Sequence, residues 1–291
     1  MTGRSTQTAF RAALVQMTAS RSVERNLVDV TALIREAKGR GAEYVQTPEV
    51  TTLMELDRAK LFVDTRPEAG NPALAHFRAL ARELGIWLHI GSMAVSVTAD
   101  KLVNRAFLIS PGGTVVARYD KIHMFDVDLP NGERYRESNN FRPGTEAVVV
   151  DLPWARMGLS ICYDLRFPAL YRALAKAGAG ILTIPSAFTV KTGEAHWHTL
   201  MRARAIENGC WVLAAAQCGL HENGRRTFGH SLVVAPWGDI VAELGVEPGV
   251  LVADINMVEV EKARSQVPSL THDRQFDVVN ATVNKNNAVT S

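Results

Sequence analysis

The chain alternates short apolar segments with amphipathic stretches, a pattern typical of α/β folds. Residues 26–38 carry apolar side chains at helical spacing, and a second such stretch begins at Asn71 and Pro72 and ends at Gly85. Other apolar segments are joined by tight turns, at residues 111–113 and 236–238. Because hairpins join antiparallel strands and helical crossovers join parallel ones, the sequence predicts two mixed sheets face to face with helices outside.

Composition excludes several classes of function. The 291 residues include 32 Lys and Arg against 30 Asp and Glu, without a dense basic run, so nothing indicates binding to nucleic acid or to a membrane surface. No apolar stretch reaches the ~20 residues that span a membrane. Three cysteines do not form a disulfide framework, and residues 1–9 lack the apolar core of a secretory signal. We expect a cytoplasmic protein with one domain over residues 9–279 and a polar tail over 280–291.

Residues 158–168 run from apolar side chains to Cys162, then to charged side chains and to Pro168. This order predicts a strand, a sharp turn and a helix, with the thiol at the end of the strand. A nucleophile there would lie at the edge of a sheet, near backbone N–H groups that can stabilise an anion. The alternative is a structural cysteine, since cysteine is among the most buried residue types.

Glu49 and Lys121 occupy similar places in the chain. Glu49 follows an apolar segment at residues 43–46 and comes directly after Pro48, and Lys121 directly follows the hairpin at residues 105–119. A carboxylate fixed in this way suits acid–base catalysis. The alternatives are a surface glutamate and a solvated lysine. Glu49, Lys121 and Cys162 nevertheless each follow a predicted strand, so we expect all three at one shared edge of the fold.

Two further segments bear on a site. Residues 124–145 form a long polar loop whose aromatic residues favour an ordered, functional loop. His196 and His198 are two positions apart on a helix expected over residues 194–208, so they face different directions and cannot chelate one metal ion together. We expect one of them to be packed and the other exposed, and we expect no metal site and no cofactor.

Three motifs resemble the signatures of the carbon–nitrogen hydrolase (nitrilase) superfamily, in the family's order and separations. They are Pro48–Glu49, residues 119–123 (YDKIH) and residues 161–168 (ICYDLRFP), with further likeness at residues 229–231 (GHS) and 236–238 (PWG). The resemblance runs from about Phe10 to Arg274. It implies a four-layer αββα sandwich, and assembly into a homodimer or a larger homo-oligomer.

The closest resemblance within the superfamily is to the branch of deaminated-glutathione amidase and omega-amidase. It rests on residues 125–130, 136–138, 195–197, 202–207 and 214–219. Nitrilases usually have Trp-Glu after the nucleophile, whereas Tyr163 and Asp164 follow Cys162 here, which favours amides over nitriles. The resemblance implies hydrolysis of a small, carboxylate-bearing linear amide by water. The alternatives are an N-carbamoyl amide hydrolase, a nitrilase, or a catalytically silent scaffold protein with this fold.

Amide hydrolysis by a thiol assigns expected roles to these residues. Cys162 would attack the carbonyl and form a thioester. Lys121 would favour the thiolate and, with the backbone N–H of Tyr163, stabilise the oxyanion. Glu49 would carry the proton, provided that burial offsets the effect of Lys121 on its pKa. The resemblance implies that Glu137 supports Lys121.

Substrate binding is predicted from fewer observations. A substrate carboxylate needs a cationic partner, and Arg166 is the first candidate. An internal salt bridge of Arg166 is the alternative. Tyr163, and Phe188 and Thr189 in a loop expected over residues 188–192, would line the pocket.

Overall fold

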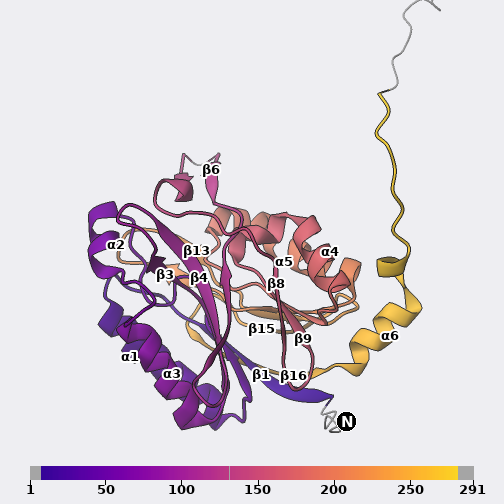
Figure 1. The fold of residues 1–291 in the computed structure, drawn as a ribbon, viewed down its shortest axis with the longest axis horizontal. Helices are drawn as coiled ribbons and strands as arrows, with labels where there is room; N and C mark the ends of the chain where they lie inside the picture. Colours follow the sequence, from indigo (N-terminus) through magenta and orange to yellow (C-terminus); the bar gives the residue numbers. More distant parts are fainter. Residues whose placement is uncertain (1–7, 131, 281–291) are drawn as a thin grey trace, which may run out of the picture.

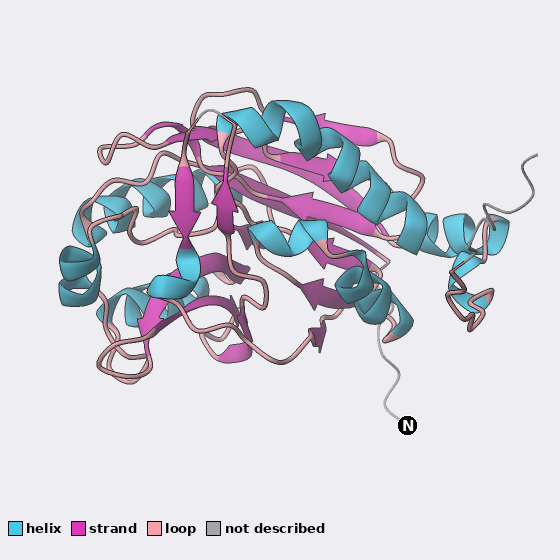
Figure 2. Cartoon of the chain, turned by 90° about the horizontal axis from the view of Figure 1, so that it is seen from above, coloured by secondary structure: helices cyan, strands magenta, loops and turns pink. Residues whose placement is uncertain are grey.

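Two six-stranded sheets form the centre of the protein (Figures 1 and 2). The structure is a computed structural model that describes residues 8–130 and 132–280. Apart from residue 280, the expected polar tail lies outside the described residues. In spatial order the first sheet contains β16 (Gly249–Asn256), β1 (Ala9–Gln16), β2 (Tyr44–Gln46), β3 (Trp87–Ser96), β4 (Leu102–Ile109) and β5 (Val115–Asp120). The second contains β15 (Ile240–Glu243), β14 (Leu232–Val234), β11 (Trp211–Ala214), β10 (Ile181–Thr183), β9 (Arg156–Leu159) and β8 (Val148–Asp151).

Both sheets are mixed, as the two kinds of connection predict. In the first sheet β1 pairs parallel with β2 and antiparallel with β16. In the second, β10 pairs parallel with β9 and β11, and β11 pairs antiparallel with β14. The two expected hairpins are present as β4–β5 and β14–β15. Apolar side chains from both sheets share one buried cluster, so the sheets pack face to face.

Helices cover the outer face of each sheet and complete four layers (Figure 1). The first sheet packs against α1 (Val23–Gly39) and α3 (Pro72–Leu84), and the second against α4 (Pro168–Lys176) and α5 (Val190–Asn208). Asn71 caps α3 and Gly85 ends it in the left-handed conformation, with φ of 63°. The expected αββα sandwich is therefore confirmed. No helix in the described part of the chain is long and apolar enough to cross a membrane.

The structure differs from the sequence-based elements in three places. Helix α5 begins at Val190 instead of residue 194, because the Thr189 side chain caps its first turn. A short helix, α2 (Arg58–Asp64), was not predicted. The polar loop at residues 124–145 contains a small hairpin of β6 (Asp126–Asp128) and β7 (Arg134–Arg136), which Figure 1 shows standing above the sandwich. The other elements are β12 (Cys218–Leu220), β13 (Arg226–Phe228) and α6 (Val258–Gln266).

A close approach of backbones positions the segment after β2. Strand β3 is irregular between Ile90 and Met93, and a Cβ atom on Gly91 would lie 2.0 Å from the Thr47 carbonyl oxygen. Only glycine leaves room for this contact. The next residue, Ser92, accepts the N–H of Val50 on its hydroxyl oxygen at 2.9 Å. The segment that carries Glu49 is therefore fixed against β3.

Candidate active site

Glu49 is held at the end of β2 by contacts from both sheets. Its Oε1 accepts hydrogen bonds from Lys121 Nζ at 2.9 Å and from Asn104 Nδ2 at 3.0 Å. Its Oε2 accepts the backbone N–H of Ala187, beyond β10 in the second sheet, at 2.9 Å. Gln217 Nε2 donates to the Glu49 carbonyl at 3.0 Å. The residue is only 5% exposed, so this carboxylate has one well-defined position.

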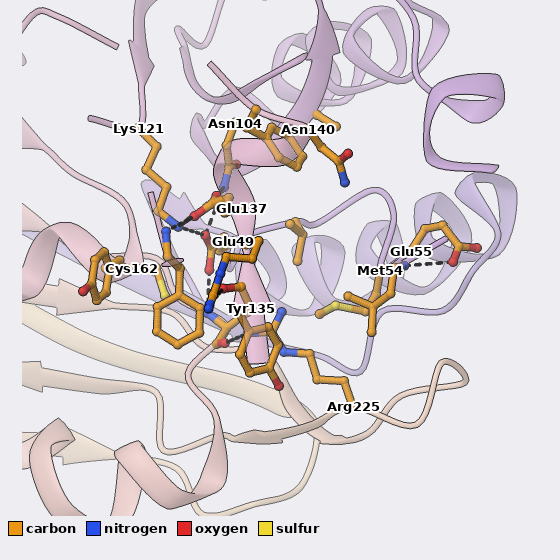
Figure 3. Close-up of a pocket in the computed structure, with 18 of the residues that line it drawn as sticks. Glu49, Met54, Glu55, Asn104, Lys121, Tyr135, Glu137, Asn140, Cys162 and Arg225 are labelled. Atoms are coloured by element: carbon orange, nitrogen blue, oxygen red, sulfur yellow. Dashed lines mark hydrogen bonds and ion pairs between the residues drawn. The ribbon is translucent and has the colours of Figure 1, made fainter. Parts of the chain in front are cut away.

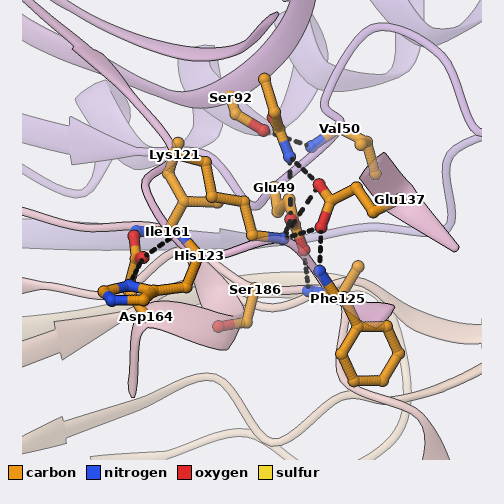
Figure 4. Close-up of polar contacts among 12 residues, drawn as sticks. Glu49, Val50, Ser92, Lys121, His123, Phe125, Glu137, Ile161, Asp164 and Ser186 are labelled. Atoms are coloured by element: carbon orange, nitrogen blue, oxygen red, sulfur yellow. Dashed lines mark hydrogen bonds and ion pairs between the residues drawn. The ribbon is translucent and has the colours of Figure 1, made fainter. Parts of the chain in front are cut away.

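Lys121 lies between two carboxylates directly after β5 (Figure 4). Besides Glu49, its Nζ binds Glu137 Oε1 at 3.1 Å and Oε2 at 2.9 Å. Glu137 Oε2 also accepts the N–H of Phe125 at 2.7 Å, which ties the loop after β5 to the lysine. The structure thus places Glu137 against Lys121, where the resemblance had put it. A buried ammonium held in this way has little freedom to move.

Cys162 was expected at the end of its strand but lies at a strained turn three residues beyond it. Strand β9 ends at Leu159, and Cys162 begins the 3₁₀ turn η2 (Cys162–Arg166) with φ of 48°. A non-glycine residue in this left-handed region costs about 1–3 kcal/mol and persists only where its surroundings fix it. Here the N–H of Cys162 donates to the Pro185 carbonyl at 2.9 Å. The structure brings Cys162, Glu49 and Lys121 together, as three strand ends predicted.

Asp164 fixes the turn that carries the thiol to the first sheet. Its side chain is fully buried and its Oδ2 accepts the N–H of Ile161 at 2.9 Å and the hydroxyl of Tyr119 at 2.6 Å. Its Oδ1 accepts the backbone N–H of His123 at 3.1 Å and contacts the His123 ring nitrogen Nδ1 at 2.7 Å (Figure 4). Tyr119 belongs to β5, so one carboxylate connects the turn that carries Cys162 to the strand before Lys121. Sequence reasoning used Asp164 only as a family marker and missed this structural role.

Burial and neighbouring charges set the protonation of the three groups. Burial raises the pKa of the Cys162 thiol and the Glu49 carboxylate raises it further, which outweighs the opposite effect of Lys121. Burial alone would also raise the pKa of Glu49, but the Lys121 ammonium overcomes it and the pKa falls below its usual value. Burial would lower the pKa of Lys121, whereas Glu137 and Glu49 raise it well above normal. At neutral pH the site therefore holds a thiol, a carboxylate and an ammonium. Lys121 does favour the thiolate, as expected, but its effect alone does not overcome burial.

A cavity of about 510 Å³ opens above these side chains (Figure 3). Its size falls within the range of small-molecule sites. We call Glu49, Lys121, Glu137 and Cys162 the cavity floor. The four residues predicted to bind substrate also line the cavity: Tyr163, Arg166, Phe188 and Thr189. Thr189 lies in no loop, however, because it caps α5.

Arg166 and Arg225 line the cavity and have no carboxylate partner among the described residues. Arg166 lies over the rings of Tyr163 and Phe188, at 5.9 and 5.5 Å, and its Nη1 is 3.3 Å from His196 Nδ1. The alternative of an internal salt bridge to Arg166 is therefore not observed in residues 8–130 and 132–280. We call Tyr163, Arg166, Phe188, Thr189, Tyr135 and Arg225 the cavity rim.

Arg225 is a rim residue that sequence reasoning missed. It lies over the Tyr135 ring at 5.2 Å and donates through Nη2 to the Ala187 carbonyl (Figure 3). Its Nε is buried without a hydrogen-bond partner among the described residues. The residue follows the turn at Asn223 and Gly224, where a solvated cation is the ordinary expectation. No local sequence signal distinguishes it from its neighbour Arg226.

The chain resembles the proteins of one known family over most of its length. The family model described as carbon-nitrogen hydrolase matches residues 11–265. The chain belongs to the carbon–nitrogen hydrolase family. It is a hydrolase of amide carbon–nitrogen bonds, and the resemblance found in the three motifs is confirmed over almost the whole sandwich.

Relatives of this hydrolase support both the fold and the class of reaction. A deaminated glutathione amidase from Yersinia enterocolitica is 40% identical over 265 residues, which cover 90% of this chain and 92% of the relative. The crystal structure of Nit3 from Saccharomyces cerevisiae, a member of branch 10 of the nitrilase superfamily, has a TM-score of 0.83 with 28% identity and covers 92% of this chain and 97% of that one. A mutant of the amidase from Nesterenkonia sp. AN1, with acrylamide added to its active-site cysteine, has a TM-score of 0.75 with 29% identity, covering 89% and 98%.

Proposed function

We propose that this hydrolase cleaves a small linear amide that carries a carboxylate, of the deaminated-glutathione type, through a thioester on Cys162. The observation that carries the proposal is the buried Glu49 carboxylate, which binds Lys121 at 2.9 Å and interacts with the Cys162 thiol. A base, a cation and a nucleophile thus meet at the floor of one cavity. The name of the Yersinia relative supports the class of substrate.

In the proposed mechanism Glu49 takes the thiol proton as Cys162 sulfur bonds to the amide carbon. The electron pair of the C=O bond moves to oxygen, where the Lys121 ammonium and the N–H of Tyr163 stabilise it. The C–N bond then breaks, and Glu49 gives its proton to the departing nitrogen. Glu49 next takes a proton from water, which attacks the thioester carbon. The C–S bond then breaks, Glu49 returns the proton to sulfur, and the acid leaves. Glu137 is a positioning residue that keeps Lys121 charged and in place.

The rim supplies the proposed recognition of the substrate. Arg166 and Arg225 line the described part of the cavity without a carboxylate partner. Arg58 also lacks one there but donates to the Asn139 carbonyl at 2.9 Å. Arg136 is paired with Asp128 at 2.7 Å. A substrate carboxylate that contacts both Arg166 and Arg225 would be oriented with its amide toward the floor. Tyr163, Phe188 and Thr189 would enclose the chain between the carboxylate and the amide.

A substrate panel tests this assignment. We expect the highest kcat/KM for deaminated glutathione, lower values for 2-oxoglutaramate and 2-oxosuccinamate, and ammonia or amine release without carbon dioxide. A faster reaction with an N-carbamoyl amide or a nitrile would contradict the assigned substrate class. Absence of turnover with every compound, together with failure of substrate to protect Cys162 from alkylation, would favour the scaffold alternative.

Two further parts of the proposal concern the state of the protein in the cell. We infer a homodimer or larger homo-oligomer, because Trp237 is 56% exposed and Ile206, which packs against the adjacent Gly238, is 53% exposed. All three cysteines are free, which fits a reducing compartment such as the cytoplasm. Light scattering of Trp237→Glu against the unchanged protein tests the first point, and fractionation of cells tests the second.

A further inference from the structure

A second strained backbone position points to a site outside the cavity. Three non-glycine residues in the described chain have positive φ: Val50, Cys162 and His230. Cys162 belongs to the cavity floor and Val50 follows Glu49, but His230, with φ of 58°, lies between β13 and β14. Its N–H donates to the Gly245 carbonyl at 2.9 Å, and its carbonyl accepts from Trp197 Nε1 at 2.8 Å. These two bonds fix an unfavourable backbone conformation and with it the direction of the imidazole.

The His230 ring meets a second histidine and a carboxylate from two other elements. Glu243, the last residue of β15, contacts His198 Nε2 at 2.7 Å and His230 Nδ1 at 2.8 Å through the same oxygen. His198 comes from α5, next to the Trp197 that binds the His230 carbonyl. The potential ligand atoms of the three residues all lie within 4.8 Å of one another. His198 and His196 do face different neighbours, as their spacing predicts, but His198 finds a partner from a distant segment.

The surroundings orient these side chains and leave them accessible. The ring of His230 stacks on Phe228 at 4.3 Å, and His198 meets the edge of the same phenylalanine at 6.1 Å. The side chains of His198, His230 and Glu243 are 37%, 24% and 30% exposed, so a hydrated ion can reach them. None of the three lines the active-site cavity.

We propose that His198, His230 and Glu243 form a binding site for a divalent transition metal ion of the zinc class. Two imidazole nitrogens and one carboxylate oxygen are a ligand set that such ions accept, with water in the remaining position. Ligands at about 2.1 Å in tetrahedral geometry lie about 3.4 Å apart. The nitrogens therefore need only move slightly away from Glu243, while the two ring protons shift to the other ring nitrogens or to solvent. The open geometry leaves the ion exchangeable.

Cobalt(II) titration of untagged, metal-stripped protein tests the proposal. The Cys162→Ser variant serves as the parent, because it removes the floor thiol as a competing ligand. We expect one Co²⁺ per chain, with the visible absorption of a four- or five-coordinate ion and no sulfur charge-transfer band, and displacement by Zn²⁺. His198→Ala and Glu243→Gln should each weaken binding by at least about tenfold. His196→Ala, on the same helix, is the matched control and should bind as the parent does.

The outcomes separate this site from the proposed function. Unchanged binding in both His198→Ala and Glu243→Gln, with circular dichroism showing folded protein, would overturn the proposal. So would absence of Co²⁺ binding by the folded parent. If either variant fails to fold, the more conservative His198→Gln decides, because it keeps a polar side chain on α5 but offers a much weaker ligand. The titration measures Co²⁺ binding and not amide turnover, so these results do not depend on whether the proposed amidase activity is correct.

Discussion

The floor and the rim of the cavity are held in different ways. Floor residues lie at strand ends, and Lys121 and Glu49 are 2% and 5% exposed, with every charge paired. Rim residues come from a small hairpin, a turn and a helix start, and Arg166 and Arg225 keep cationic groups without a carboxylate. The floor is therefore complete before substrate arrives, whereas the rim still needs an anion. This contrast agrees with the proposal that the floor carries out the chemistry and the rim selects the substrate.

The largest effect should come from the floor nucleophile. Cys162→Ala should lower amide turnover by at least about a thousandfold, since removal of a covalent nucleophile leaves only binding and electrostatic stabilisation. Initial-rate measurement of amine release checks it, with Cys218→Ala as the control that removes a different buried cysteine. Near-normal turnover by Cys162→Ala would show that Cys162 is not the nucleophile, and the assignment of the chemistry to the floor would be wrong.

Loss of the floor cation should stop the reaction before the thioester. In Lys121→Met the oxyanion loses its charged partner, and a single oxyanion donor is worth roughly a hundredfold or more in rate. Mass spectrometry of substrate-treated protein should then show no acyl adduct on Cys162. An adduct that forms as fast as in the unchanged protein would show that Lys121 acts after the attack. The fold is checked separately, because the variant leaves Glu49 and Glu137 facing each other without a cation.

A rim substitution should affect binding more than chemistry. Arg225→Gln should raise KM for a carboxylate-bearing amide by about 10- to 100-fold, the value of a hydrogen bond to a charged group, with kcat within a few-fold. Arg226→Gln, one residue further along and exposed on β13, is the matched control and should leave KM unchanged. A large fall in kcat with constant KM would place Arg225 with the floor.

The smallest expected effect is the pH dependence. The pKa of Glu49 lies below its ordinary 4.5, so the base stays ionised above that value. The pKa of Cys162 lies above its ordinary 9.0 and that of Lys121 above 10.5, so the thiol and the ammonium keep their protons below those values. His196, beside Arg166, has a pKa below 6.5. We therefore expect a constant kcat/KM from pH 6.5 to 9.0. A break inside this interval would indicate a thiolate formed near neutral pH.

The lowered pKa of Glu49 also means that the folded protein should lose stability in acid. The pKa of Glu49 is lower in the folded state than in the unfolded chain, so its contribution is present above the unfolded value and disappears as the pH falls through the folded one. Acid should therefore weaken the floor before it affects the rim cations, which stay charged. This order can be followed by comparing unfolding midpoints of Glu49→Gln and the unchanged protein as the pH is lowered.

The sequence allowed the layers and most of the floor to be predicted. Strand ends are readable because an apolar run stops abruptly, as it does before Glu49 and Lys121, and a turn residue marks each hairpin. Glu137 came only from the resemblance, since nothing in the polar stretch around it indicates a partner. Helix α2 escaped prediction because seven residues carry too little periodicity, although Asp57 caps its first turn.

The rim and the histidine cluster could not be predicted, for one physical reason. Arg225 and Tyr135 are 90 positions apart, and His198 and Glu243 are 45 apart, so only the packed fold brings them together. The β6–β7 hairpin is held by a few backbone hydrogen bonds and by contacts with the sandwich. It has no hydrophobic pattern that would predict it from sequence. Local sequence signals report the neighbours of a residue along the chain and not those across it.

The position of Glu49 between the sheets has a consequence for how the enzyme tolerates change. Its Oε2 binds the Ala187 N–H and its carbonyl binds Gln217, both on segments that follow strands of the opposite sheet, while the other carboxylate oxygen faces Lys121 directly after β5 of its own sheet. Packing of inner-face side chains such as Leu14 sets the separation of the sheets, near 10 Å in general, and misplacement by ~1 Å can cost a hundredfold in rate. An overpacked core should thus slow turnover at a stability cost of only about 1–3 kcal/mol. The catalytic rate should therefore report on the separation of the two sheets.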